Sequence, residues 1–189
     1  MKKKLILAVC IISFIVAVAA TWHFIRFYDN GEARIFEIEG TEGGGMWGIT
    51  PGFETHSKHF FILNPPEDLH ELKAVLEEFI DQNWQEEASR RDLPVKYNWS
   101  FYRESWGFSR YWTQKFNYWG NDDIIDYHNH DIIATAIIEP LNNEIHYFVS
   151  RRSSGLKDYG ETLERIHYLN GEIVSHTFIE RVNGINILR

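Results

Sequence analysis

Cysteine is almost absent from this chain of 189 residues. The single cysteine, Cys10, lies within an apolar N-terminal segment. The rest of the chain therefore has no disulfide, no thiol nucleophile and no zinc site built on cysteine. We expect its core to be held by packing and hydrogen bonds alone.

Basic residues are also scarce. Lysine and arginine total 19 against 27 aspartates and glutamates, which gives a formal net charge of −8. Setting aside Lys2, Lys3 and Lys4 leaves 16 basic residues against 27 acidic ones, a charge of −11 for the remainder. Such a field repels nucleic acid and anionic lipid headgroups. We therefore expect no nucleic-acid partner, whereas a basic protein partner is compatible with the charge.

The chain has no linker-like or low-complexity stretch and no internal repeat. We predict that residues 27–189 form a single domain, large enough to bury roughly 70% of its unfolded surface. The glycine-rich run at 40–46 lacks the Gly-Lys-Ser/Thr ending of a phosphate-binding loop. We predict no cofactor.

An apolar run follows a basic start. Met1–Lys4 contains three lysines, and Leu5–Trp22 has only Ser13 and Thr21 as polar interruptions. This pattern is typical of a secretory signal or a signal anchor, and it resembles bacterial export signals. Eighteen helical residues extend about 27 Å, close to the roughly 30 Å hydrocarbon core of a bilayer.

We interpret residues 1–26 as a signal anchor or signal peptide that meets the membrane through residues 5–25. The N-terminus would stay in the cytoplasm and the domain would lie outside, in a periplasm or at a cell surface. Ala17-Val18-Ala19 resembles a cleavage site, and cutting there would release a secreted protein. The apolar character continues past this site, which favours the retained anchor.

One amphipathic helix is predicted to end near Trp84–Ala88. Asn64-Pro65-Pro66-Glu67 has the capping side chain, the early prolines and the acid that favour a helix start. The residues with the three-four spacing of one helix face are Leu69, Leu72, Leu76, Phe79, Ile80 and Asn83.

The rest of the chain predicts antiparallel β-structure. Asn170-Gly171 separates two strand-like runs, 162–169 and 172–182, which is a strong hairpin pattern. A two-residue turn there would pair position 165 with 176 and place His167 and His176 on one face. The expected fold is α+β: one amphipathic helix on a mostly antiparallel sheet, preceded by a transmembrane or signal helix.

Aromatic residues are concentrated between Tyr97 and Trp119, where they fill 11 of 23 positions. Such side chains form either a core or a binding face. The alternation of aromatic positions changes phase at Phe101-Tyr102. Burying the aromatic side chains on both sides of this point therefore requires a bulge or a second covering layer. The candidate binding residues are Trp106, Tyr111, Trp112 and Trp119.

A histidine-rich stretch supplies the candidate metal ligands. Asp126, His128 and His130 alternate, so on a strand they would share one face. Such a trio could ligate a divalent metal that activates water, and the alternative is a solvated polar loop.

Two functions are compatible with these patterns. The first is a membrane-anchored or exported binding module for a protein or cell-envelope partner, because no catalytic motif is recognisable. The second is an extracytoplasmic metal-dependent hydrolase that uses Asp126, His128 and His130. Either would have the membrane itself as a further partner.

Overall fold

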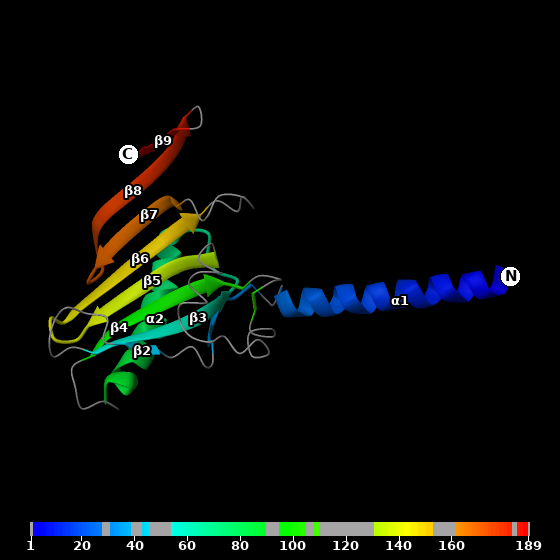
Figure 1. Cartoon of the computed structure of the whole chain (residues 1–189), viewed down its shortest axis with the longest axis horizontal. Coiled ribbons are helices and arrows are strands. Elements are labelled where there is room, and N and C mark those ends of the chain that lie inside the picture. The colour runs from blue at the N-terminus through cyan, green and yellow to red at the C-terminus, as the bar shows by residue number, and fades with distance from the viewer. Residues whose placement is uncertain are drawn as a thin grey trace.

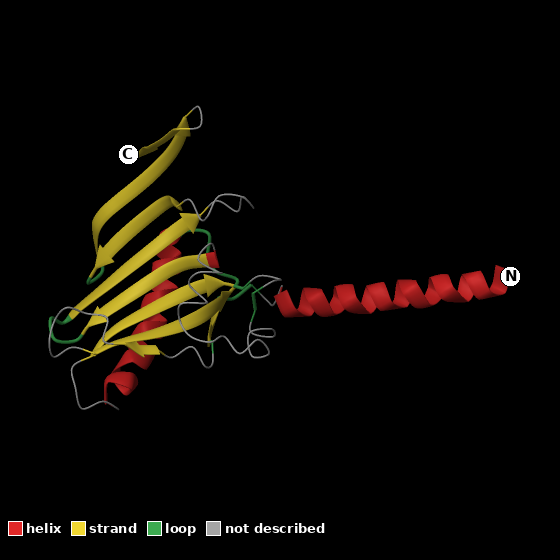
Figure 2. Ribbon diagram, viewed as in Figure 1, coloured by secondary structure: helices red, strands yellow, loops and turns green. Residues whose placement is uncertain are grey.

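The structure is a computed structural model of the whole chain. It describes residues 2–27, 31–38, 43–45, 54–89, 95–104, 108–109, 131–152, 162–182 and 185–188. Two helices and nine connected strands make up these residues, and the sheet is mostly antiparallel. The α+β class predicted from the sequence is confirmed (Figure 1, Figure 2).

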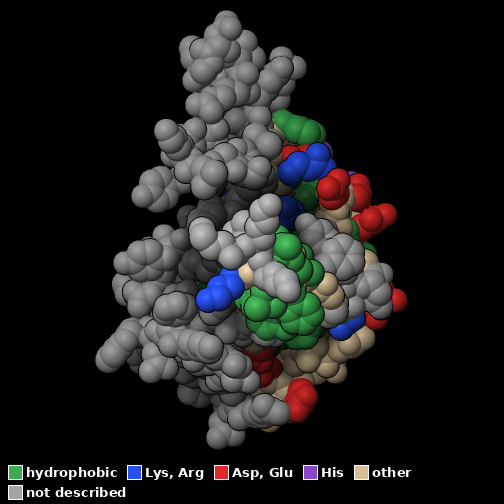
Figure 3. Space-filling model, turned by 90° about the vertical axis from the view of Figure 1, so that its right-hand side faces the viewer, with side chains coloured by type: hydrophobic (Ala, Val, Ile, Leu, Met, Phe, Trp, Pro, Cys, Tyr) green, Lys and Arg blue, Asp and Glu red, His purple; other side chains and the backbone are tan. Residues whose placement is uncertain are grey.

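The N-terminal helix α1 runs from Lys2 to Phe27 and projects away from the sheet (Figure 1). Large apolar side chains are exposed along it, among them Ile6, Ile12, Phe14 and Val16. Figure 3 is turned toward the side to which α1 points, and hydrophobic side chains cluster near the centre of that view. Within the described part of the chain, we find no helix with the length and apolarity needed to cross a membrane. The anchor at residues 5–25 stays a prediction.

The sheet follows the order β1-β3-β4-β5-β6-β7-β8-β9, and β2 pairs with β3. Its strands are β1 (Arg34–Glu37), β2 (Gly43–Gly45), β3 (Glu54–Leu63), β4 (Val95–Arg103), β5 (Ile132–Glu139), β6 (Glu144–Arg152), β7 (Thr162–Leu169), β8 (Glu172–Val182) and β9 (Ile185–Leu188). From β4 onward, each strand pairs antiparallel with the next one along the chain. Strands β3 and β4 pair in parallel.

Helix α2 (Leu69–Ser89) is the crossover between those two parallel strands. Parallel neighbours need a long connection, and a helix that packs back on the sheet provides one. The apolar stripe of α2 is buried on the sheet, with Leu72, Leu76 and Ile80 at most 2% exposed. This packing confirms the predicted amphipathic helix.

The start of α2 lies later than predicted. Asp68 caps the helix, and its Oδ1 accepts hydrogen bonds from the backbone N–H groups of His70 and Glu71 at 2.9 and 3.0 Å. These bonds hold the pKa of the Asp68 carboxyl below its ordinary value. Asn64, the predicted cap, instead has a positive φ of 49° at the end of β3. The two prolines after it therefore belong to the connection and not to the first helical turn.

Both faces of the sheet carry a core in the region of β3 and β4. The larger core lies under α2 and includes Trp99 and Phe101, whereas the smaller one joins Phe61, Tyr102 and Phe108 on the other face. The pairing of β4 with β5 is irregular at Phe101/Tyr102. The change of phase in the aromatic pattern thus corresponds to both features expected from the sequence: a register irregularity and a second layer that covers the sheet.

The β7–β8 hairpin also contains a register shift, between His167 and Tyr168. It pairs His167 with Ser175 and Ile166 with His176. Directly paired residues share a face, so His167 and His176 lie on opposite faces of the sheet. The prediction that they share a face was wrong. One extra residue on β8 moves every later residue of that strand to the opposite face from the one expected.

Candidate functional site

The residues that the sequence singled out for binding and metal ligation lie outside the described part of the chain. These are Trp106, Tyr111, Trp112 and Trp119 for binding, and Asp126, His128 and His130 for a metal. Among the residues that are described, no group of three or more His, Cys, Asp or Glu side chains could hold a metal ion.

The described part of the aromatic stretch belongs to the core. Five of its aromatic side chains are at most 1% exposed: Tyr97, Trp99, Phe101, Tyr102 and Phe108. Phe60 stacks on Phe101 and lies 5.1 Å, centroid to centroid, from Trp99. For these positions the core interpretation is confirmed, and a candidate site must be sought elsewhere.

A cavity of about 330 Å³ lies between the second half of α2 and the strands β1, β3 and β4. It is lined by Glu37, Lys58, Phe60, Phe79, Asn83, Glu86, Glu87 and Trp99. Its volume lies at the lower end of the range for small-molecule sites. Three carboxylates and one ammonium group line it, so its formal charge is negative, and aromatic rings form part of its wall.

Lys58 is the central charge of this cavity. Its side chain is only 9% exposed, and its Nζ lies 3.0 Å from Glu87 Oε2 and 3.4 Å from Glu37 Oε1. A buried ammonium group needs such partners because its desolvation costs several kcal/mol. Two carboxylates on different elements, β1 and α2, therefore hold the lysine in place.

The geometry of β3 explains why Lys58 points inward. Lys58, Phe60 and Ile62 alternate along the strand and share the face that is covered by α2. A lysine in register with buried apolar residues was the available sequence signal for this site. The sequence analysis did not single out this signal.

Trp99 adds a polar atom without a partner. Trp99 lines the cavity, and its buried Nε1 has no hydrogen-bond partner among the described residues. A buried donor that makes no hydrogen bond costs about 1–3 kcal/mol. One of the residues that line the cavity thus carries an unsatisfied buried donor.

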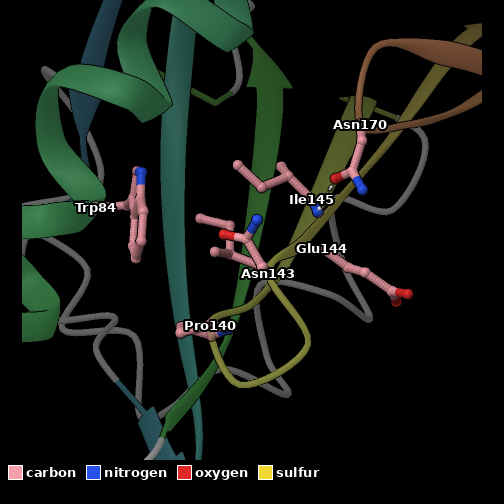
Figure 4. A pocket seen from close by; sticks show the side chains of 7 residues that line it. Trp84, Pro140, Asn143, Glu144, Ile145 and Asn170 are labelled. Atoms are coloured by element: carbon pink, nitrogen blue, oxygen red, sulfur yellow. Dashed lines mark hydrogen bonds between the residues drawn. The ribbon is translucent and has the colours of Figure 1, made fainter.

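A second hollow, of about 310 Å³, lies at the end of the sheet (Figure 4). Trp84 faces it from α2, across from the β5–β6 turn and Asn170. Asn170 Oδ1 accepts the backbone N–H of Ile145 at 2.9 Å. The Glu144 carboxylate points away from Trp84, and its Oε2 instead lies 3.2 Å from His146 Nε2. This hollow therefore offers an aromatic wall without a convergent set of charges.

Comparisons with known proteins provide no relative on which to base an assignment. No protein-family model, no curated protein and no solved structure matches the chain. The function must therefore be argued from the residues themselves.

Proposed function

We propose that this protein is a membrane-tethered binding module that takes a basic side chain of a partner protein into the Lys58 cavity. The observation that carries the proposal is the composition of that cavity: three carboxylates around one buried ammonium group, walled by aromatic rings.

Charge decides between classes of ligand. The cavity has a formal charge of −2, and the whole chain has −8. The field therefore attracts a cation and repels an anion. The rings of Phe79 and Trp99 add a wall suited to cation–π contact. A lysine or arginine side chain, with an apolar stem and a charged head, matches both features.

The tether is the N-terminal segment at residues 5–25. A helix that is apolar on every side is stable only where its surface is covered, by protein or by lipid. The exposed apolar side chains of α1 lie on a helix that projects from the domain, next to a lysine-rich start. We take lipid as the covering material, and the domain then faces the outer compartment.

The binding test uses the full chain in detergent and two peptide probes, N-acetyl-Gly-Arg-Gly amide and its neutral citrulline isostere. The readout is the indole N–H signal of Trp99 in an NMR titration, assigned with Trp99→Phe. We expect the arginine peptide to shift this signal and the citrulline peptide to bind at least tenfold more weakly. Equal binding of both peptides would exclude recognition of the charge.

Two variants test whether the cavity prefers a positively or a negatively charged ligand. Lys58→Met removes the internal cation, so it should tighten binding of the arginine peptide while it lowers the melting temperature. Glu86→Gln should weaken binding, whereas Glu78→Gln, an equal change of charge elsewhere on α2, should not. Loss of binding in Lys58→Met with no effect of Glu86→Gln would mean that the carboxylates do not hold the guanidinium group, and it would overturn the proposal.

The tether is tested separately by membrane fractionation. The full chain should stay with membranes after extraction at alkaline pH, and Ile12→Arg combined with Val16→Arg should release it. Full release of the unaltered chain would contradict the tether and leave the cavity experiment unaffected.

A further inference from the structure

The face of the sheet opposite α2 carries a row of polar side chains on β6, β7 and β8. Register pairing aligns Phe148, His167 and Ser175 across the three strands, and aligns Ser150, Arg165 and Thr177 beside them. Tyr147, Val149 and Ile166, the neighbours along the strands, belong to the core under α2. The polar residues therefore face away from that core.

Phe148 contacts two side chains of this row, His167 and Arg165. The His167 ring stacks on the Phe148 ring at 4.3 Å between centroids and 13° between planes. Arg165 Cζ lies 4.7 Å from the same ring centroid. Arg165 is exposed and has no carboxylate partner among the described residues. Its guanidinium group thus contacts the same ring as the His167 imidazole and is available to a ligand.

His167 is joined to a second histidine. His167 Nε2 lies 3.1 Å from His146 Nδ1, and His146 Nε2 lies 3.2 Å from Glu144 Oε2. A hydrogen bond between two ring nitrogens requires one with a proton and one without. When both rings are neutral and His146 donates to Glu144, the second proton lies on His167 Nε2. The outer nitrogen, His167 Nδ1, then carries no proton.

One added proton changes this outer nitrogen. The Glu144–His146–His167 chain can then keep both internal hydrogen bonds and place an N–H on His167 Nδ1. An N–H donor on the same face as the Arg165 guanidinium group, with hydroxyls on the neighbouring strands, is a donor set suited to a carboxylate or phosphate oxygen. Protonation therefore converts an acceptor into a donor at this point.

We propose that Arg165, His167, Ser150, Ser175 and Thr177 form an oxyanion site that takes up one proton when it binds a carboxylate or phosphate group. The charged groups that face His167 are Glu144 and His146 from β6 and Arg165 from its own strand. On β8, Ser175 lies directly opposite His167, and Glu172 lies on the same face at the turn, opposite Leu169. This site is separate from the Lys58 cavity, which lies on the other face of the sheet.

The charge balance keeps the proton off the free protein. Burial, followed by His146 and Arg165, lowers the pKa of His167 below its ordinary value. A bound anion acts in the opposite direction and raises that pKa, so binding and proton uptake favour each other. Below the pKa of the free protein the proton is already present, and the coupling disappears.

The test titrates the full chain in detergent with sulfate and with acetate. Sulfate keeps its charge between pH 5 and 8, so any pH dependence belongs to the protein, and acetate reports on carboxylates. Calorimetry in two buffers of different ionisation enthalpy counts the protons. We expect uptake of about one proton near pH 7.5 and an affinity that rises up to about tenfold per pH unit as the pH falls toward the His167 pKa.

Variants separate the anion contact from the proton. Arg165→Gln should weaken sulfate binding at least tenfold, and His167→Gln should leave binding that no longer depends on pH. His176→Gln, on the other face of the same hairpin, is the control and should change neither. Binding without proton uptake, unchanged binding in Arg165→Gln, or no binding at 20 mM of either anion would overturn the proposal. A preference for acetate or for sulfate identifies a carboxylate or a phosphate-like ligand.

Discussion

The Nδ1 atom of His59 lies 2.9 Å from the hydroxyl oxygen of Tyr102, and both side chains are at most 1% exposed. The two residues come from β3 and β4, the parallel pair that α2 connects. They face away from α2, next to the small core of Phe61 and Phe108. A polar contact is thus built into the second core layer.

We predict that Tyr102→Phe destabilises the domain by about 1–3 kcal/mol, because it takes the hydroxyl group away from a buried imidazole nitrogen. Denaturant unfolding followed by far-ultraviolet circular dichroism measures the change. Tyr168→Phe is the matched control: its hydroxyl meets His70 Nδ1, but His70 is exposed and can bind water instead. Equal losses in the two variants would show that burial of the histidine is not decisive.

Tyr147 is a second buried tyrosine, but we expect removal of its hydroxyl group to have the opposite effect to that at Tyr102. It is 1% exposed, and within the part of the chain that the structure describes its buried hydroxyl oxygen has no hydrogen-bond partner. Burial, with Glu77 and Asp81 nearby, raises the pKa of this tyrosine well above its ordinary value. We predict that Tyr147→Phe leaves stability unchanged or raises it by up to about 1 kcal/mol, because an unsatisfied polar group is removed. A loss of more than about 1 kcal/mol in the same unfolding experiment would reveal a partner, such as a buried water.

Local signals in the sequence were sufficient for the fold class and for most strand positions. Thr162–Leu169 and Glu172–Val182 form strands with the predicted bounds, because apolar alternation and turn residues act over short distances. The start of α2 was misplaced by competition between two capping signals. Asn64 and Asp68 are both good caps, and the chain uses the one closer to the apolar stripe.

Features formed by residues far apart in the chain were harder to predict from the sequence. The Lys58 cavity joins β1, β3, β4 and α2, so its residues meet only through the strand order. Likewise, one extra residue on β8 decides which face His176 occupies, and no composition signal marks that bulge. The site residues proposed from sequence, such as Trp112 and His128, lie outside the described residues and stay predictions.

Glu139 provides a prediction for acid unfolding. Lys96 donates a hydrogen bond to its Oε1 at 2.6 Å, and this bond, ahead of any other cause, lowers the pKa of the Glu139 carboxyl from its ordinary value of 4.5. A depressed pKa in the folded state contributes stability above pH 4.5, and this stability is lost as the pH falls through the folded value. Lys96 is 41% exposed, so screening keeps the contribution below about 1 kcal/mol.

The measurement is urea unfolding between pH 2 and 7. Lys96→Met should flatten the loss of stability below pH 4.5 and leave the slope above pH 5 unchanged. Lys73→Met removes a different lysine–glutamate ion pair, with Glu77 on α2, and is the comparison. An unaltered acid limb in Lys96→Met would mean that Glu139 keeps its low pKa through Asn142 instead, whose amide Nδ2 donates to Oε2 at 3.0 Å.

The turn between β7 and β8 gives the last prediction. Asn170 and Gly171 both have positive φ, 48° and 88°, as a two-residue hairpin requires. A Cβ at position 171 would meet only the Lys73 ammonium group, at 3.9 Å, so space is not the constraint. Gly171→Ala should therefore destabilise by about 1–2 kcal/mol through backbone strain alone.

Gly31→Ala is the matched variant for this turn. Gly31 has a similar φ of 85° with nothing within 4 Å of an added Cβ, but it precedes β1 at the edge of the sheet. Its strain can relax locally, so we expect a smaller loss of stability than for Gly171, whose hairpin joins β7 to β8 within the sheet. Hydrogen exchange of the β7 and β8 amides should increase in Gly171→Ala only. Unchanged exchange together with unchanged stability would mean that the turn tolerates a left-handed alanine, and strain would not be what selects glycine there.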